Sequence, residues 1–112
     1  MSQLELVSPI EIEKRDSELI KNPIIISILL ELGKIKKLTY EDIKKRLGYE
    51  EDALRVALNY LESIKFIKQN PSNDPNKKYE DRRYLLGLEG MFFLNKLKDN
   101  FPELRDSFNF FF

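Results

Sequence analysis

The stretch LTYEDIKKRLGYEEDALRVALNYLESIKFIK, which runs from Leu38 to Lys68, decides the fold. Thr39 is placed to cap a helix, because its side-chain oxygen can accept a backbone N–H and the acidic residues that follow suit the positive end of a helix dipole. Ile43 and Leu47 lie one turn apart on a single face, so we expect both to point inward. Gly48 follows the last apolar position, where a left-handed residue commonly ends a helix. The spacing therefore predicts a short helix between Thr39 and Gly48.

A second helix is predicted directly after this turn. It begins among the acidic residues 50–52, and its apolar side chains recur at helical spacing, at Leu54, Ala57, Leu58, Leu61 and Ile64. Phe66 and Ile67 then favour a strand. Two short helices, a turn that contains glycine and a following strand together predict a helix-turn-helix.

A helix that is buried on most sides is predicted before this pair. Asn22 is a good N-cap, and Pro23 suits the first helical position, where its missing N–H costs little. The residues from Ile24 to Leu32 are apolar nearly all round, which is typical of a buried helix. Gly33 is expected to end this helix, and a short extended piece should lead from it into the helix pair.

A β-hairpin is predicted after the pair. Its first strand lies around Phe66–Gln69, and the turn formers of residues 70–76 follow. Residues 77–87 hold the second strand, in which apolar side chains alternate with other residues, at Tyr84, Leu86 and Leu88. A last helix is expected after Gly87, so the predicted fold class is mainly α with a small β-hairpin (α+β).

The chain, residues 1–112, is long enough for one domain with a single core. Residues 1–21 are expected to form an N-terminal arm, either an extended piece or a frayed helix, which Ser8-Pro9 interrupts. Residues 22–88 should form the core, and residues 89–112 a C-terminal helical tail.

Composition excludes several kinds of chemistry. The chain has no cysteine and no histidine, which excludes disulfides, thiolate nucleophiles, imidazole bases and the usual zinc sites. It also shows no glycine-rich phosphate loop or nucleophile motif, so we expect neither an enzyme nor a bound cofactor or metal. The start of the chain lacks the pattern of a signal peptide, and its longest apolar run is too short to span a bilayer. We therefore expect a soluble, cytoplasmic protein.

The formal net charge is zero, but the charges are unevenly spread. Residues 34–46 hold six basic and two acidic side chains, and residues 65–83 hold six basic and three acidic ones. Residues 50–62, the second helix of the pair, hold one basic and four acidic side chains. Two basic patches therefore flank an acidic helix.

The order of helices, hairpin and final helix resembles the winged helix-turn-helix domains of the ArsR and MarR families of transcriptional regulators. LTYEDIKKRLG resembles their scaffold helix, and LRVALNYLESIKFI resembles their recognition helix running into the hairpin. Asn22-Pro23, followed by a helix rich in isoleucine and leucine, resembles the first helix of these domains. YLLGLEGMFFL resembles the segment that leads from their hairpin into the last helix. This resemblance implies a dimeric, sequence-specific DNA-binding transcriptional regulator, with the second helix of the pair in the major groove and the hairpin, or wing, beside the phosphate backbone.

The resemblance and the charges together give a set of candidate DNA contacts. Arg55 and Asn59 are at outward positions of the second helix, together with Val56 and Tyr60, and can hydrogen-bond guanine and adenine, respectively. Phosphates are the expected partners of the basic side chains on the first helix and the hairpin, which are Lys44, Lys45, Lys77, Lys78, Arg82 and Arg83.

An alternative is a winged helix that binds a protein. The acidic residues 50–52 lie at the helix end that would enter the groove, where they repel phosphates. The same acids also serve as ordinary partners of a helix dipole, and basic side chains on a hairpin also serve as solvated charges that protect a sheet edge. The candidate contacts alone leave both functions open.

The C-terminal tail predicts a partner surface. Its apolar residues recur at alternating gaps of three and four, as in a heptad seam, at Leu94, Leu97, Phe101, Leu104, Phe108 and Phe111. With Phe112, they carry more aromatic surface than one small domain covers, and the family resemblance implies a homodimer through the terminal helices.

The last eight residues allow a second interpretation. They resemble the short peptide by which replication and repair proteins dock on sliding clamps, with Phe108, Phe111 and Phe112 at the plug positions. Arg105 stands where that motif has glutamine. Docking on such a clamp therefore stays open beside dimerisation, as does a small apolar effector.

Overall fold

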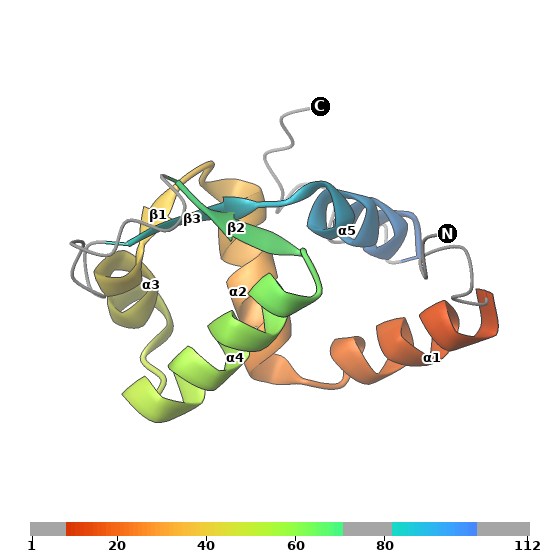
Figure 1. The fold of residues 1–112 in the computed structure, drawn as a ribbon, viewed down its shortest axis with the longest axis horizontal. Helices are drawn as coiled ribbons and strands as arrows, with labels where there is room; N and C mark the ends of the chain where they lie inside the picture. Colours follow the sequence, from red (N-terminus) through yellow and green to blue (C-terminus); the bar gives the residue numbers. More distant parts are fainter. Residues whose placement is uncertain (1–8, 71–81, 101–112) are drawn as a thin grey trace, which may run out of the picture.

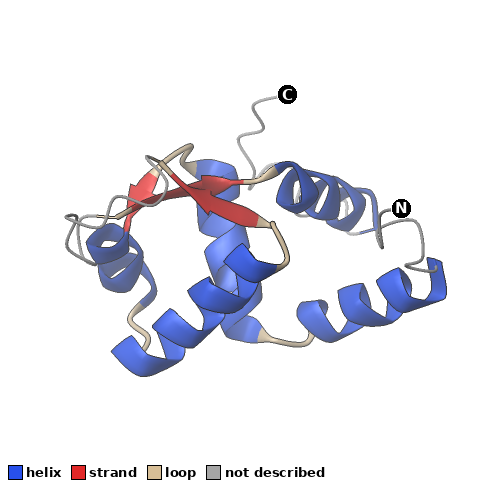
Figure 2. Ribbon diagram, in the orientation of Figure 1, coloured by secondary structure: helices blue, strands red, loops and turns tan. Residues whose placement is uncertain are grey.

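The structure, a computed structural model, describes residues 9–70 and 82–100. In these ranges the chain forms five helices and one small antiparallel sheet (Figures 1 and 2). The helices are α1 (Pro9–Ile20), α2 (Pro23–Lys34), α3 (Tyr40–Leu47), α4 (Glu51–Ser63) and α5 (Leu88–Asn100). The strands are β1 (Leu38–Thr39), β2 (Ile67–Gln69) and β3 (Arg83–Leu86). The mainly α fold class with a small hairpin is confirmed.

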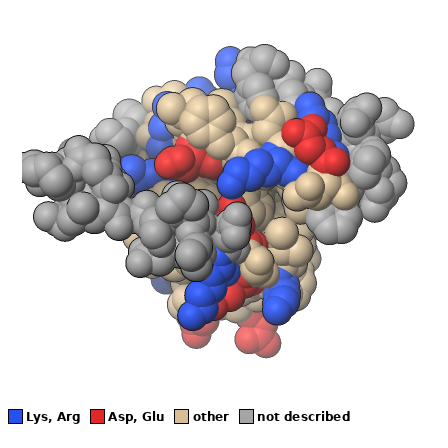
Figure 3. Space-filling view, turned by 90° about the vertical axis from the view of Figure 1, so that its right-hand side faces the viewer, with Lys and Arg blue, Asp and Glu red and all other residues tan. Residues whose placement is uncertain are grey.

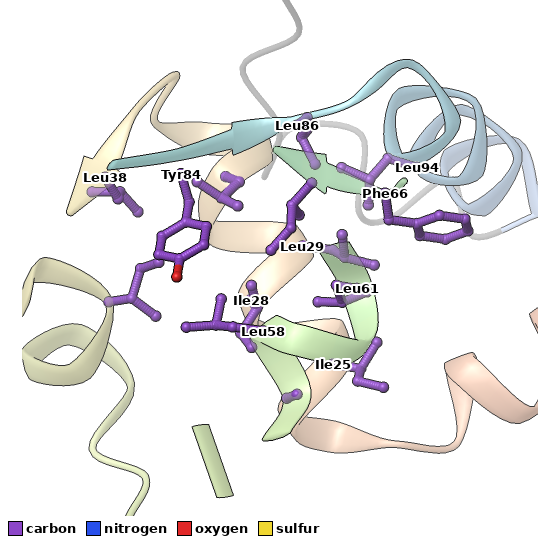
Figure 4. Close-up of a cluster of buried hydrophobic side chains, with 14 of the residues drawn as sticks. Ile25, Ile28, Leu29, Leu38, Leu58, Leu61, Phe66, Tyr84, Leu86 and Leu94 are labelled. Carbon is purple, nitrogen blue, oxygen red and sulfur yellow. The ribbon is translucent and has the colours of Figure 1, made fainter. Parts of the chain in front are cut away.

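The central element is α2, which packs against the other four helices and β3. Asn22 caps it, since its side-chain oxygen accepts the N–H groups of Ile24 and Ile25, and Pro23 occupies the first turn. Its side chains Ile28, Leu29 and Leu32 are completely buried, and others from α4, the sheet and α5 close around them (Figure 4). Each such side chain contributes about 1.5–3 kcal/mol when it is removed from water.

The sheet ties together the two ends of the helix-turn-helix, because β1 leads into α3, β2 follows α4, and both strands pair with β3. Its strand order is β1-β3-β2, with Leu38 opposite Tyr84 and Ile67 opposite Leu86. The pairing of β2 with β3 confirms the predicted hairpin. The loop that connects them, residues 71–81, lies outside the described residues.

Two local predictions were wrong, and one had left two structures open. Of the extended piece and the helix expected for the N-terminal arm, residues 9–20 form a helix, α1, because Pro9 is compatible with the first turn of a helix and Leu19 is buried in the core. Gly33 does not end α2; it is buried inside the helix, which continues to Lys34. Leu88 does not continue the alternation of β3, because it begins α5, and it is 65% exposed.

Close backbone approach explains why glycine occurs where β3 meets α5. The N–H of Gly87 donates to the carbonyl of Phe66, 2.8 Å away. A Cβ atom on Gly90 would lie only 2.2 Å from that same carbonyl oxygen, so a larger residue requires α5 to move away from the sheet.

Candidate nucleic-acid interface

A capping box and a left-handed glycine fix the direction of α3. The N–H of Asp42 donates to Oγ1 of Thr39 (3.0 Å), and the N–H of Thr39 donates to Oδ2 of Asp42 (3.3 Å). At the other end Gly48 has a φ of 71°, and its N–H donates to the carbonyl of Lys44. The predicted cap and stop are both confirmed. The chain then turns into α4 at Glu50, its N-cap.

One side of α4 faces solvent. Leu54, Leu58 and Leu61 are completely buried, whereas Val56 is 69% exposed and Tyr60 is 40% exposed. Asn59 is also exposed. The expected outward orientation is therefore found at these three positions, and an apolar valine lies at the middle of the exposed face.

A single carboxylate neutralises much of the cationic charge near the start of α4. Oε1 of Glu51 lies 3.6 Å from Nη2 of Arg55 and 3.8 Å from Nζ of Lys44. The Arg55 guanidinium also lies over the ring of Tyr40, 5.9 Å from its centroid, and its side chain is 42% exposed. Arg55 is therefore held along the helix surface, toward α3, rather than extended into solvent.

Sequence reasoning did not assign this role to Glu51. The spacing of Glu51 and Arg55, four residues apart on one helix, is the signal that predicts the first of these pairs. The second pair joins two helices across the turn, so only the structure reveals it.

The start of β3 lies beside the start of α3. Arg83 is opposite Thr39 in the sheet, and the carbonyl of Arg82 accepts the N–H of Tyr40 at 2.9 Å. Arg83 is exposed and Arg82 is half-buried, while Lys45 on α3 is exposed. The sheet therefore gathers cations from two distant parts of the sequence at the α3 end of the molecule, left in Figure 1. Lys77 and Lys78 lie outside the described residues.

On the face formed by α1 and α5, the described charged side chains are of both signs. Figure 3 shows basic and acidic side chains interspersed there, and Nζ of Lys96 on α5 lies 3.1 Å from Oδ2 of Asp16 on α1. Within the described ranges, no group of three or more acidic, cysteine or histidine side chains is arranged to hold a metal ion. No helix in those ranges is long and apolar enough to cross a membrane.

Two of the expected partner contacts belong to the core instead. Leu94 is completely buried and Leu97 is 5% exposed, because they form the side of α5 that packs on the domain. The exposed apolar residues of α5 are Leu88 and Phe92, at 65% and 54% exposure. The other expected contacts, Phe101, Leu104, Phe108, Phe111 and Phe112, lie outside the described residues.

The family model of the TFIIE alpha subunit matches residues 16–106, which includes all of the helix-turn-helix, the sheet and α5. The chain belongs to the TFIIE alpha family. A search of curated proteins found no match.

Solved structures of bacterial regulators have the same fold as this TFIIE alpha family member. A MarR family regulator from Neisseria meningitidis superposes with a TM-score of 0.63 at 15% identity, over 96% of this chain and 78% of that one. Reduced HlyU from Vibrio cholerae superposes with a TM-score of 0.58 at 18% identity, over 82% of this chain and 95% of that one. The winged helix-turn-helix resemblance predicted from the sequence is confirmed, and the protein shares its fold with these two bacterial proteins.

Proposed function

We propose that the protein is a transcription factor that binds duplex DNA, with α4 in the major groove and the β2–β3 hairpin against the phosphate backbone. In this arrangement Asn59 and Arg55 contact base edges once Arg55 leaves Glu51. Lys44, Lys45, Arg82 and Arg83 contact phosphates. The predicted contacts of Lys77 and Lys78, outside the described residues, and the predicted cytoplasmic location belong to the same proposal.

The pairing of β1 with β3 is the observation that carries this proposal. It brings Arg82 and Arg83, which we call the wing root because they lie where the hairpin enters β3, to the N-terminal end of α3. Arg82 and Arg83 then lie beside the start of α3, and Lys44 and Lys45 lie in its last turn, so a phosphate backbone that passes along α3 meets cations at both ends of that helix. The pairs to Glu51 do not prevent this, because exposed ion pairs contribute only about 0.2–1 kcal/mol each.

Salt-dependent duplex binding tests the proposal. The double variant Arg82→Ala with Arg83→Ala is expected to flatten the slope of log affinity against log salt by about 0.9 per lost phosphate contact. The control is Lys96→Ala with Lys98→Ala, which removes the same charge from α5. Equal slopes in the two double variants would refute a role for the wing root.

A homodimer through α5 is part of the proposal, because two copies would place two α4 helices about one DNA turn apart. Leu88 and Phe92 support it, since they lie one turn apart and are both largely exposed. The tail contacts expected from the sequence, outside the described residues, would extend that interface. Light scattering tests it: Phe92→Asp is expected to halve the mass, and a wild-type mass equal to one chain would contradict it.

Protein binding is a second candidate function, favoured by one observation. Val56, at the middle of the exposed face of α4, is 69% exposed and has no polar atom for a base edge. In this alternative the winged helix docks on another protein of the transcription, replication or repair machinery. Docking on a sliding clamp through the Phe-rich terminus also stays a prediction, and removing residues 109–112 would abolish clamp binding without changing the mass of the free protein.

A further inference from the structure

A groove separates α4 from the α1–α2 junction. It has a volume of 620 Å³, and its lining comes from the end of α1, the start of α2 and the outer side of α4 (lower half of Figure 1). None of the candidate DNA contacts that the structure describes lines it, because Arg55 and Lys44 lie toward Glu51 on the α3 side of the helix. The proposed DNA binding therefore gives this groove no role.

The base and walls of this groove are apolar. Leu19, Ile25 and Ala57 are buried at its base, and Val56 and Tyr60 are exposed along its α4 wall. Val56 and Tyr60 are one helical turn apart, so they present a continuous apolar strip. A groove between helices with exposed apolar side chains on its wall has the form on which the apolar face of a partner helix can pack.

The rim of the groove is acidic on both sides. Glu18 on α1 and Asp52 on α4 are the charged residues of its lining, and both are exposed. Among the described residues, the lining contains no lysine or arginine. The nearest described cations along the chain are Lys21, which is exposed just after α1, and Arg55, which pairs with Glu51 on the α3 side; neither is part of the lining. An occupant with negative flanks would be repelled here, and one with positive flanks attracted.

The shape of the groove selects a helix as the occupant. Its described lining comes from three helices and from Asn22 between α1 and α2, so an extended peptide finds no strand edge there with which to pair. The α4 wall from Asp52 to Tyr60 is about 12 Å long, which corresponds to roughly two turns of a docked helix. A helix with apolar anchors one turn apart fits this length, and long basic side chains on either side of the anchors reach the acidic rim while their stems cover apolar surface.

We propose that this groove binds an amphipathic helix of a partner protein whose apolar stripe is flanked by lysine or arginine. This proposal rests on the second candidate function, protein binding, and it specifies the docking surface and the chemistry of the partner. It does not depend on DNA binding, since the groove is lined by none of the candidate DNA contacts within residues 9–70 and 82–100.

Two synthetic helical peptides with the same leucine stripe, one flanked by lysine and one by glutamate, test the proposal by NMR titration of the full chain. The lysine peptide is expected to bind and to shift the amides of Val56 and Tyr60. Val56→Asp is expected to weaken it at least tenfold, although this change adds a negative charge that attracts the peptide. The control Asn100→Asp, which adds the same charge at an exposed position at the end of α5, leaves binding unchanged.

The acidic rim is tested separately. The double variant Glu18→Gln with Asp52→Asn is expected to weaken the lysine peptide by roughly two- to thirtyfold at low salt, from two exposed ion pairs, and not to weaken the glutamate peptide. Equal binding of the two peptides by the wild-type protein, or shifts that map away from Val56, overturns the proposal. A dimer in the free protein that Val56→Asp dissociates would also overturn it, because a second copy would then occupy the groove.

The same measurements separate this proposal from DNA binding. Arg82→Ala with Arg83→Ala is expected to weaken duplex binding and to leave peptide binding intact. Peptide binding without duplex binding contradicts only the DNA proposal, and duplex binding without peptide binding contradicts only the groove.

Discussion

Replacing Glu51 with glutamine is expected to tighten binding to duplex DNA. In the free protein its carboxylate lies 3.8 Å from Nζ of Lys44 and 3.6 Å from Nη2 of Arg55, so it competes with a phosphate for Lys44 and with a base edge for Arg55. Exposed pairs contribute about 0.2–1 kcal/mol each, and the loss of two pairs corresponds to roughly two- to thirtyfold in affinity. The freed Lys44 also steepens the salt slope by about 0.9, the value for one phosphate contact.

Fluorescence anisotropy of a short labelled duplex, titrated between about 50 and 200 mM salt, measures both quantities. Glu89→Gln is the control, because it removes the same charge from an exposed position at the start of α5 rather than beside Lys44 and Arg55. Equal tightening by Glu51→Gln and Glu89→Gln would show that only net charge matters. That result, or no tightening at all, would refute the reasoning about Glu51.

Three substitutions test the account of the fold, each by urea unfolding. Gly90→Ala is expected to destabilise the protein by about 1–3 kcal/mol, because the new Cβ meets the carbonyl of Phe66 at 2.2 Å; an unchanged midpoint would contradict that contact. Lys65→Gly is expected to stabilise by about 0.5–1 kcal/mol, because Lys65 has a φ of 65°, and a loss of stability would argue against backbone strain there. Thr39→Ala is expected to cost about 0.5–2 kcal/mol through the lost cap, whereas Thr39→Ser should retain most of the stability.

The sequence predicted the helix-turn-helix well because its signals are local. Thr39 with Asp42 and the left-handed Gly48 determine the limits of α3 from interactions within a few residues. The helical spacing of the apolar side chains likewise located α4 and its buried side. Such signals do not depend on the rest of the fold.

The sequence failed where distant contacts decide the structure. The Arg15 guanidinium lies over the ring of Phe66, 4.9 Å from its centroid, and Asp16 pairs with Lys96, eighty residues along the chain. These contacts join α1 to the domain, and no local pattern indicates them. Gly33 was expected to end α2, but packing around it inside the core keeps it helical.

The candidate site likewise combines features that local sequence signals predicted with features that depend on distant contacts. The exposure of Val56 and Asn59 followed from helical periodicity, whereas the pair between Lys44 and Glu51 depends on how two helices meet. On α5 the regular spacing did identify an apolar side that includes Leu94, but the same spacing marks a core-facing side and a partner-facing side equally well. Only burial in the fold distinguishes the two.

NMR mapping of a bound duplex tests the central claim most directly. The account predicts that, at low salt, a short duplex shifts the amides of α3, the start of α4 and the start of β3, around Lys45 and Arg83, and that these shifts disappear as salt is raised. Shifts confined to α1 and α5, or no shifts at low salt, would contradict a DNA-binding role for the winged helix.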